Sequence, residues 1–345
     1  MKLLYLGIER GTSEHRANAL RRLGHSVMTV NPSLGIPSTF SSGPMQRILA
    51  VWARYAGYAG LASLSRNYVL QAVSGKTFDA VWVDGGALVS RGLVEDLKKI
   101  AGKVVNYNLD DPYGNRDANY WRQYLNAIPA YDLIVVVREE NVQEARQLHA
   151  KKVLHVFRAA DEVAHAPRVL TEKEKAKWGS EILFVGTAFP ERGPFFAELI
   201  RLGVPISIYG GRWQRLKEWK TIEGHWKGPG LEDAYTYSTA ILAAKACLGL
   251  LSSENRDLHT QRSMEIPALG GVFCAQRTSE HLALYREDQE AVFWDSPEEC
   301  ANKCSALLRD DAWRESVAHK GHERYLTNGW TNMKVAEKIL TAAFE

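Results

Sequence analysis

The stretch from Ser252 to Gln276 concentrates residues whose side chains could bind an anion. An apolar run at 246–251 comes directly before it and is typical of a buried parallel strand, and ligands bind outside the carboxyl ends of such strands. We predict that a short helix follows, with Thr260 as its N-cap and Arg262 in its first turn. The free N–H groups of a helix start and the guanidinium of Arg262 both suit a diphosphate.

Two carboxylates of this stretch, Asp257 and Glu265, are eight positions apart. One can then lie in the loop and the other on the helix, where both could accept hydrogen bonds from sugar hydroxyls. The spacing resembles the acidic-x7-Glu motif of retaining glycosyltransferases of the GT-B fold, in which the first acid binds the donor sugar and the second the ribose. Because the first acid is Asp here, the role of Asp257 and the stereochemistry stay open. The alternative is an ordinary strand-loop-helix unit with Glu265 solvated.

The sequence motif R-x-x-E-I-P-A-L-G-G starts at Arg262 and is preceded by His259 and Thr260. It resembles the CgeB-like glycosyltransferases of the spore maturation protein type, most closely over residues 182–325. The resemblance implies an α/β chain of GT-B fold, with two Rossmann-like domains facing across a cleft and a C-terminal helix that crosses back to the first domain. It also implies that His259, Thr260, Arg262 and Glu265 bind the nucleotide.

A second group of candidates opens the second half of the chain. A predicted strand ends in Gly186 and Thr187, and Arg192 follows at the start of a helix. This order resembles the start of the GT-B donor domain, where a basic residue contacts the donor diphosphate, so Arg192 is the candidate for that role. A surface arginine at a helix entry is the alternative. The next strand ends at Tyr209 and Gly210, where a base or ribose could lie against an aromatic ring and open backbone.

The first half alternates predicted strands and helices, which is typical of parallel α/β layers. Gly7 and Gly11 have a spacing unlike the dinucleotide motif G-x-G-x-x-G, so hydride chemistry is not indicated. Asp110 and Asp111 follow a strand at 104–108. A carboxylate there could take the proton of an acceptor hydroxyl, and we expect only one of the two to enter the site, because adjacent side chains of an extended chain point opposite ways. A capping Asp-Asp-Pro turn explains them equally well.

Residues 38–73 form a long connection in which apolar and aromatic residues alternate with arginines. We predict one or two amphipathic helices here. A helix pair packed on the sheet is the favoured interpretation. The alternative is a surface for a lipid-linked or polymeric acceptor, with peripheral membrane contact, since cationic and aromatic side chains suit a membrane interface.

The length of 345 residues is enough for two domains, each with its own core. We place an acceptor-side Rossmann-like domain at 1–165, a donor domain at 166–327 and a terminal helix at 328–345. The net charge of +3 is too small to indicate a binding surface for a polyanion. A nucleic acid acceptor is therefore disfavoured but stays an alternative. The chain begins without an apolar run of signal-peptide length, so we expect a cytoplasmic protein, with the inner face of the membrane as a peripheral location.

The four cysteines all lie in the second half and are interpreted as buried, reduced thiols. Cys300 and Cys304 are one helical turn apart but lack further ligands at a suitable spacing, so no zinc site is predicted. The chain also lacks the D-x-D motif that GT-A transferases use to hold a metal-bound nucleotide sugar. We therefore expect no catalytic metal and no tightly bound cofactor.

These patterns favour a glycosyltransferase that moves a sugar from a nucleotide sugar, foremost a UDP-sugar, to a saccharide, lipid-linked or other acceptor in polysaccharide or glycoconjugate biosynthesis. Arg192 and Arg262 would stabilise the leaving diphosphate without a metal. Asp257 would act on the sugar, and Asp110 or Asp111 on the acceptor. The rivals are a nucleotide-sugar epimerase of the same fold and a non-catalytic coat or assembly protein that retains it.

Overall fold

The computed structural model describes residues 1–40, 43–252 and 255–345. Positions 41–42 of the connection at 38–73 and positions 253–254 of the predicted anion-binding stretch therefore lie outside the described residues. The chain forms two compact units. The first contains Met1–Arg158, Asn332–Glu345 and, from the middle of the second half, Asn255 and Arg256. The second contains the rest of the described chain between Ala159 and Thr331.

The first unit is built on a six-stranded sheet in the order β2-β1-β3-β4-β5-β6, in which every neighbouring pair is parallel. Its strands are short apolar runs, as expected for a parallel sheet covered on both faces. They are β1 (Lys2–Leu6), β2 (Ser26–Val30), β3 (Phe78–Asp84), β4 (Ala101–Tyr107), β5 (Leu133–Val136) and β6 (Val153–His155).

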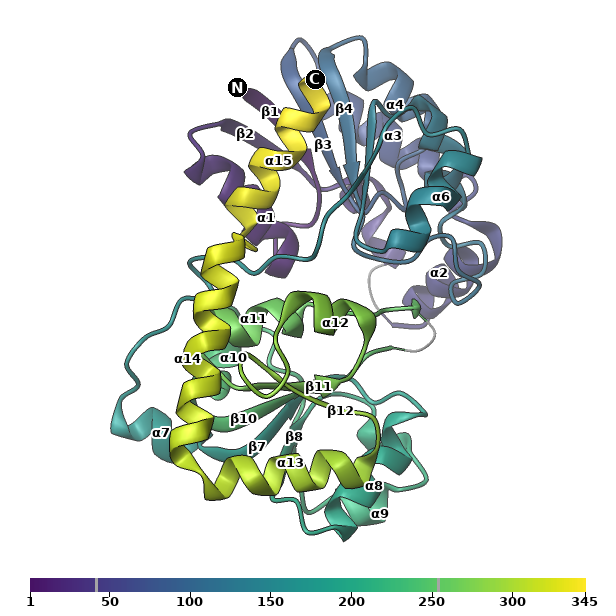
Figure 1. Ribbon diagram of the computed structural model, residues 1–345. Helices are drawn as coiled ribbons and strands as arrows, with labels where there is room; N and C mark the ends of the chain where they lie inside the picture. The colour runs from purple at the N-terminus through teal and green to yellow at the C-terminus, as the bar shows by residue number, and fades with distance from the viewer. Residues whose placement is uncertain (41–42, 253–254) are drawn as a thin grey trace. The chain divides into compact units, whose positions relative to one another are not determined.

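Helices cover both faces of this sheet, and the connection at 38–73 is helical as predicted. The helices are α1 (Gly11–Arg22), α2 (Gly43–Ala56), α3 (Leu61–Ala72), α4 (Arg91–Leu97), α5 (Arg122–Ala127) and α6 (Glu139–Gln147), with short 3-10 turns at Pro32–Gly35, Ser38–Phe40 and Ile128–Ala130. The last helix, α15 (Asn332–Phe344), packs against α1 and against β4 and β5 (Figure 1). The predicted return of the C-terminal helix to the first unit is confirmed.

The second unit repeats this plan with a parallel sheet in the order β12-β11-β10-β7-β8-β9. Its strands are β7 (Ser180–Val185), β8 (Ile206–Tyr209), β9 (Trp226–Gly228), β10 (Ala244–Gly249), β11 (Phe273–Gln276) and β12 (Val292–Trp294). Its helices are α7 (Glu172–Trp178), α8 (Arg192–Arg201), α9 (Trp219–Ile222), α10 (Ala234–Ala243), α11 (Arg262–Ala268), α12 (Ser279–Leu284), α13 (Pro297–Arg309) and α14 (Asp311–Asn328), with a 3-10 turn at Trp213–Arg215.

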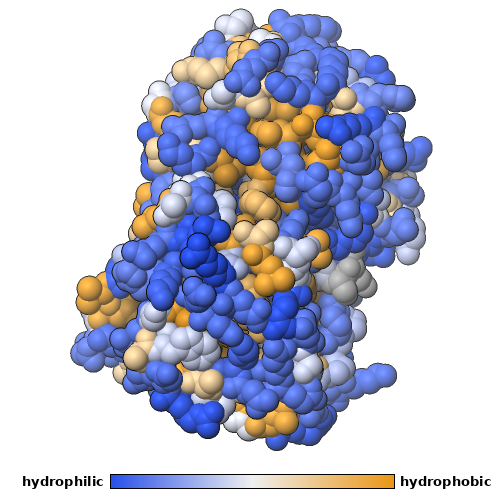
Figure 2. Space-filling model, in the orientation of Figure 1, coloured by the Kyte–Doolittle hydropathy of each residue, from blue (hydrophilic) through white to orange (hydrophobic). Residues whose placement is uncertain are grey.

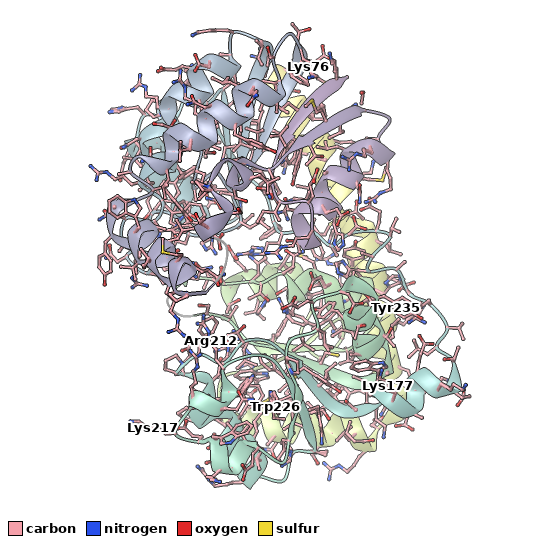
Figure 3. All side chains as sticks on the ribbon, turned by 180° about the vertical axis from the view of Figure 1, so that it is seen from behind. Lys76, Lys177, Arg212, Lys217, Trp226 and Tyr235 are labelled. Atoms are coloured by element: carbon pink, nitrogen blue, oxygen red, sulfur yellow. The ribbon has the colours of Figure 1, made fainter. Side chains whose placement is uncertain are left out.

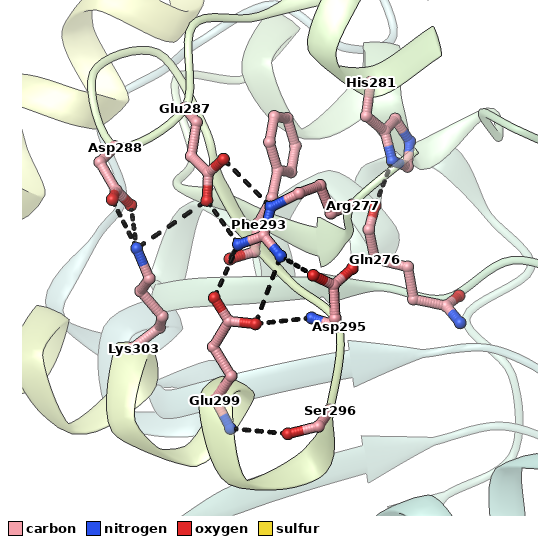
Figure 4. Close-up of polar contacts among 10 residues, drawn as sticks. All are labelled: Gln276, Arg277, His281, Glu287, Asp288, Phe293, Asp295, Ser296, Glu299 and Lys303. Carbon is pink, nitrogen blue, oxygen red and sulfur yellow. Dashed lines mark hydrogen bonds and ion pairs between the residues drawn. The ribbon is translucent and has the colours of Figure 1, made fainter. Parts of the chain in front are cut away.

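A cluster of charged side chains ties the outer strands of the second sheet to α13 (Figure 4). Arg277, directly after β11, donates from Nη2 to Glu287 at 2.7 Å and to Glu299 of α13 at 2.6 Å, and its Nη1 donates to Asp295. Lys303 of α13 pairs with Asp288 at 2.6 Å. Because the guanidinium meets three carboxylates at once, this edge of the sheet is held by a network and not by an isolated surface pair.

Hydrophilic residues predominate on the face of the molecule drawn in Figure 2, with apolar residues in smaller groups. Among the described helices, none combines the length and the apolar character needed to cross a membrane.

Candidate functional site

Arg192 lies at the first position of α8, a few residues beyond the end of β7, and its side chain is buried. The Nη1 group donates to the carbonyl of Thr187 at 2.7 Å, and Nη2 donates to the carbonyls of Leu250 at 3.2 Å and Leu251 at 3.1 Å. The guanidinium thus joins the loop after β7 to the segment after β10. The alternative of an exposed arginine at a helix entry is wrong.

The surroundings of Arg192 are unfavourable for a second positive charge. Burial and, to a smaller extent, the nearby guanidinium of Arg262 lower the pKa of Arg192 to about 10, against the opposite effect of Glu191 and Asp257. The buried Nε–H of Arg192 has no hydrogen-bond partner among the described residues. A site with two close guanidiniums and an unused donor favours an anionic ligand.

Arg262 is the first residue of α11, and its guanidinium carbon lies 5.7 Å from the ring centroid of Tyr237. Burial opposes its charge, Tyr237 and Glu265 favour it, and the pKa of Arg262 is raised on balance. The predicted N-cap was wrong. The cap position is Gln261, without a side-chain cap, while the N–H of Thr260 donates to Ser263 Oγ at 3.0 Å. The side chain of Ser263 satisfies a donor one residue before the cap, so the helix starts later than predicted.

Glu265 points into the interior of the second unit and is only 4% exposed, so the alternative of a solvated helix residue is wrong. Its Oε2 accepts the hydroxyl proton of Tyr237 at 2.8 Å, and its Oε1 lies 3.7 Å from Nε2 of His165. The backbone N–H of Asp161 donates to Nδ1 of His165 at 3.0 Å, which leaves the ring proton on Nε2, facing the carboxylate. Glu265 is therefore held in one orientation from two sides.

The sequence interpretation did not single out His165 or Tyr237 as partners of Glu265. Tyr237 lies on α10, the helix that directly precedes β10 in the chain, and His165 lies in a segment without regular structure. No local spacing relates either residue to α11, since the contact between Tyr237 and Glu265 joins residues that are 28 positions apart. The available signal was the sequence of residues 231–244, which favours a helix that carries Tyr237.

The ends of β7 and β8 approach each other at two glycines. A Cβ atom on Gly210 would lie 1.8 Å from the carbonyl oxygen of Gly186, so no larger residue fits there. Trp213 Nε1 donates to this same carbonyl of Gly186 at 3.1 Å, and Trp226, which Figure 3 labels, donates to the carbonyl of Gly210 at 3.0 Å. Gly210 thus allows close backbone packing between the two loops. The half-buried ring of Tyr209 precedes it, and burial raises the pKa of Tyr209.

The remaining candidates of the second unit differ in their surroundings. Thr187 is exposed, whereas Asp257 and Thr260 are half-buried. His259 is buried, and its Nδ1 lies 2.5 Å from a carboxylate oxygen of Glu280. The charges of Arg262 and Asp257 therefore both act on Arg192. His259 is bound to Glu280 of α12.

Asp110 and Asp111, in the first unit, have different environments. Asp111 is 2% exposed, and both of its oxygens accept hydrogen bonds from Arg256, at 2.6 and 2.7 Å, with Asn141 as a further donor at 3.1 Å. Arg256 also donates to Glu144 at 2.8 Å. This ion pair holds the pKa of Asp111 below its usual range although burial acts against it. Asp110 is exposed.

Three of the four cysteines converge. Cys274 of β11 and Cys300 and Cys304 of α13 are buried, and their sulfur atoms all lie within 4.8 Å of one another. Among the described residues this is the one group of three or more potential metal ligands. The predicted lack of a partner for the Cys300–Cys304 pair was wrong, because the fold brings Cys274 to it. The three thiols also pack in the apolar core of the second unit.

Comparison with known proteins gives a family match over part of the chain and a similarity in fold. Residues 192–341 match a family described as glycosyl transferase-like. Among curated proteins, none matches the chain by sequence.

Solved structures of similar fold span nearly the whole chain. The sucrose-phosphate synthase of Thermosynechococcus elongatus has a TM-score of 0.68 at 11% identity and covers 100% of this chain and 99% of its own. The trehalose-6-phosphate structure from E. coli, bound with UDP-2-fluoro glucose, has a TM-score of 0.66 at 12% identity, covering 99% of each chain. The alpha,alpha-trehalose-phosphate synthase (UDP-forming) from Burkholderia vietnamiensis has a TM-score of 0.63 at 11% identity, covering 100% and 99%.

The two six-stranded parallel sheets with their flanking helices are those of the GT-B fold, as predicted. At such low identity the structural likeness shows the fold and not the reaction. The family match over 192–341, taken with that fold, supports a glycosyltransferase.

Proposed function

We propose that this chain is a CgeB-like, metal-independent glycosyltransferase that takes a nucleotide sugar as donor and uses the second unit to bind it. The observation that carries the proposal is the pair of guanidiniums at Arg192 and Arg262, one of which has a pKa lowered to about 10. A donor diphosphate would supply the negative charge that this pair lacks. The two arginines fall within the matched residues 192–341.

In the proposed reaction the two arginines stabilise the charge that grows on the leaving diphosphate. Fixed guanidiniums and the buried Nε–H of Arg192 are already in place, so they need little reorganisation as the glycosidic bond to phosphate breaks. Asp257 is proposed to orient the sugar, and Glu265 to accept hydrogen bonds from the ribose. The loops that carry Gly186, Thr187, Tyr209, Gly210, His259 and Thr260 complete the proposed donor site.

Asp110 is proposed as the base that takes the proton from the acceptor hydroxyl. The structure favours it over Asp111, because Asp110 is exposed and Asp111 has both carboxylate oxygens engaged by Arg256. An exposed carboxylate remains able to accept a proton from a substrate. Asp111 then has a structural part, holding Arg256 in the first unit.

A UDP-sugar is the proposed donor, since UDP occurs in the names of two structures of similar fold. The proposed acceptor is a saccharide or a lipid-linked glycan precursor, held by the first unit. The cytoplasmic location expected from the sequence, with peripheral membrane contact through residues 38–73, belongs to the same proposal. We likewise propose domain boundaries at residues 165 and 327.

Incubation of the purified protein with a panel of nucleotide sugars tests the proposal. We expect release of the free nucleoside diphosphate together with a glycosylated product when a cell extract of glycans and lipids is supplied. Arg192→Lys keeps a positive charge but loses the guanidinium fork, so this variant should release less nucleoside diphosphate than the unmodified protein. An isomerised donor would indicate an epimerase instead, and no turnover with any donor would indicate a non-catalytic protein.

A further inference from the structure

Helix α2 presents an unusual outer surface for a helix of a globular unit. Its exposed apolar residues recur three and four positions apart and so share one side of the helix. They are Met45 (37% exposed), Ile48 (53%), Val51 (57%), Trp52 (48%) and Tyr55 (66%). A groove on this side is lined by Arg47, Ile48, Val51, Trp52, Tyr55 and Ala56. We call these exposed apolar residues the α2 face.

The α2 face is not the side by which the helix is anchored. Ala53 is buried, and Leu49 packs with it against Ile36 and Tyr58 in a small apolar cluster. Near the end of the helix, the backbone carbonyl of Arg54 accepts a hydrogen bond from the backbone N–H of Asn119 at 2.8 Å. Within the α2 face, Trp52 Nε1 donates to the carbonyl of Ala59 at 3.0 Å, while about half of its side chain stays exposed. The helix is therefore held on the first unit mainly by its other side, and the apolar surface of the α2 face remains open for another partner.

The stretch of sequence that contains the helix carries charge of one sign. From His15 to Phe78 the sequence contains no Asp or Glu, whereas the same range includes Arg16, Arg21, Arg22, Arg47, Arg54, Arg66 and Lys76. Arg47 is exposed and lines the groove of the α2 face. Asp117, from another part of the chain, lies near Arg54 but is itself bound by Arg116 at 2.7 Å. Arg16 is paired with Asp84 at 2.8 Å, and Arg66 is paired with Asp96. The α2 face thus combines aromatic and aliphatic side chains with the exposed cations of its own helix, Arg47 and Arg54.

We propose that the α2 face docks the first unit on an anionic lipid membrane. A helix of this composition lies in the plane of a membrane interface, with its apolar side among the acyl chains and its cations at the headgroups. Tryptophan and tyrosine prefer that interface, because one part of the ring system is apolar and one part is polar. Arginines near the surface add attraction to negatively charged headgroups.

This inference extends the proposed function, since it brings the acceptor-side unit to the surface where a lipid-linked acceptor would be. It can be tested without any sugar transfer. The full-length protein is mixed with vesicles of phosphatidylcholine alone or of phosphatidylcholine with phosphatidylglycerol, and the bound fraction is measured by flotation. We expect binding to the anionic vesicles only, and weaker binding as salt is raised, because salt screens the headgroup charge.

Variants identify the surface responsible. Ile48→Ser combined with Val51→Ser is expected to weaken vesicle binding by on the order of tenfold. Arg47→Gln is expected to weaken it by about fivefold. The matched controls are Val169→Ser, at a valine that is 92% exposed in the second unit, and Arg91→Gln, at an exposed arginine of the first unit. Both controls should bind like the unmodified protein, and thermal unfolding should confirm that every variant is folded.

Three results would overturn the proposal: no binding to anionic vesicles, equal binding to vesicles without anionic lipid, or unchanged binding in the Ile48→Ser, Val51→Ser variant. Size-exclusion chromatography tests whether a second copy of the chain, and not a membrane, covers the α2 face. A dimer that this double variant dissolves would mean that a second copy of the chain covers the α2 face. Failure of vesicle binding would leave donor turnover in solution intact, so the outcome is distinguishable from failure of the proposed glycosyl transfer.

Discussion

At the scale of single residues, the candidate donor site depends on buried charge. Arg192 and Glu265 are 7% and 4% exposed, and each is fixed by groups of the protein itself. Tyr237 donates to the carboxylate of Glu265, whereas Arg192 donates to backbone carbonyls. Buried charges are costly unless they are paired, which gives a ligand of opposite charge a direct energetic role.

Glu265→Ala should weaken the binding of uridine diphosphate by on the order of tenfold, because a carboxylate that accepts from ribose hydroxyls makes charge-assisted hydrogen bonds. It should also lower the free energy of unfolding by about 1–3 kcal/mol, since the Tyr237 hydroxyl loses its buried acceptor. Calorimetric titration and urea unfolding measure the two effects.

Glu174→Ala is the matched control for this prediction. Glu174 accepts from Tyr235, a neighbour of Tyr237 on α10, at 2.7 Å, but on the exposed side of the unit (Figure 3). Its loss should leave the affinity for uridine diphosphate unchanged. If Glu265→Ala also left that affinity unchanged, Glu265 would have to be removed from the donor site.

At the scale of elements, α11 and α12 are joined through one buried histidine. His281 Nδ1 donates to the carbonyl of Gln276 at 2.7 Å, so its Nε2 accepts from Ser263 Oγ at 2.8 Å. Ser263 Oγ in turn accepts from the backbone N–H of Thr260 at 3.0 Å. The start of α11, and with it Arg262, is thus positioned by a chain of hydrogen bonds that requires a neutral imidazole.

This arrangement predicts a pH dependence of stability. Burial lowers the pKa of His281 from 6.5 to about 4, so below pH 6.5 the unfolded chain binds a proton that the folded chain does not. Stability is therefore fully present above pH 6.5 and falls as the pH approaches 4, by about 3 kcal/mol for this one group. Urea unfolding at a series of pH values should show a smaller acid dependence in His281→Gln than in the unmodified protein. His319→Gln, at an exposed histidine, serves as the control and should change nothing.

At the scale of the whole molecule, each unit has its own parallel sheet, and the chain passes between the units more than once. Asn255 and Arg256 belong to the first unit although the described residues before and after them belong to the second. Arg256 is fixed there by Asp111 and Glu144. The GT-B fold thus distributes the candidate groups over two units, with Arg192, Asp257, Arg262 and Glu265 in the second.

The proposed use of guanidiniums as the charge-stabilising groups predicts turnover that does not depend on a divalent cation. Sugar transfer should continue at an unchanged rate in excess chelator, whereas Arg262→Ala should lower kcat by on the order of a hundredfold because preorganised positive charge is lost. The release of nucleoside diphosphate measures both. Loss of activity in chelator with recovery in magnesium or manganese would contradict this mechanism.

The sequence by itself determined the elements and most of the types of residue at the candidate site. Apolar runs predicted the parallel strands, because a strand covered on both faces must be apolar along its length. The strand-loop-helix order placed Arg192 and Arg262 at helix starts, where the structure also has them. Local spacing was sufficient for these features, since each depends on residues that are neighbours in the chain.

Only the tertiary structure decided which side chains meet. Tyr237 reaches Glu265 across 28 positions, and Arg256 reaches Asp111 across 145. Cys274 joins Cys300 and Cys304 for the same reason, because β11 packs beneath α13 in one core. Such contacts depend on the order of strands in the sheet and on the packing of helices over it, which no local pattern records. The tertiary structure also decided that Ser263 and His281, and not the side chain of Thr260, fix the start of α11, because burial made their hydrogen bonds obligatory.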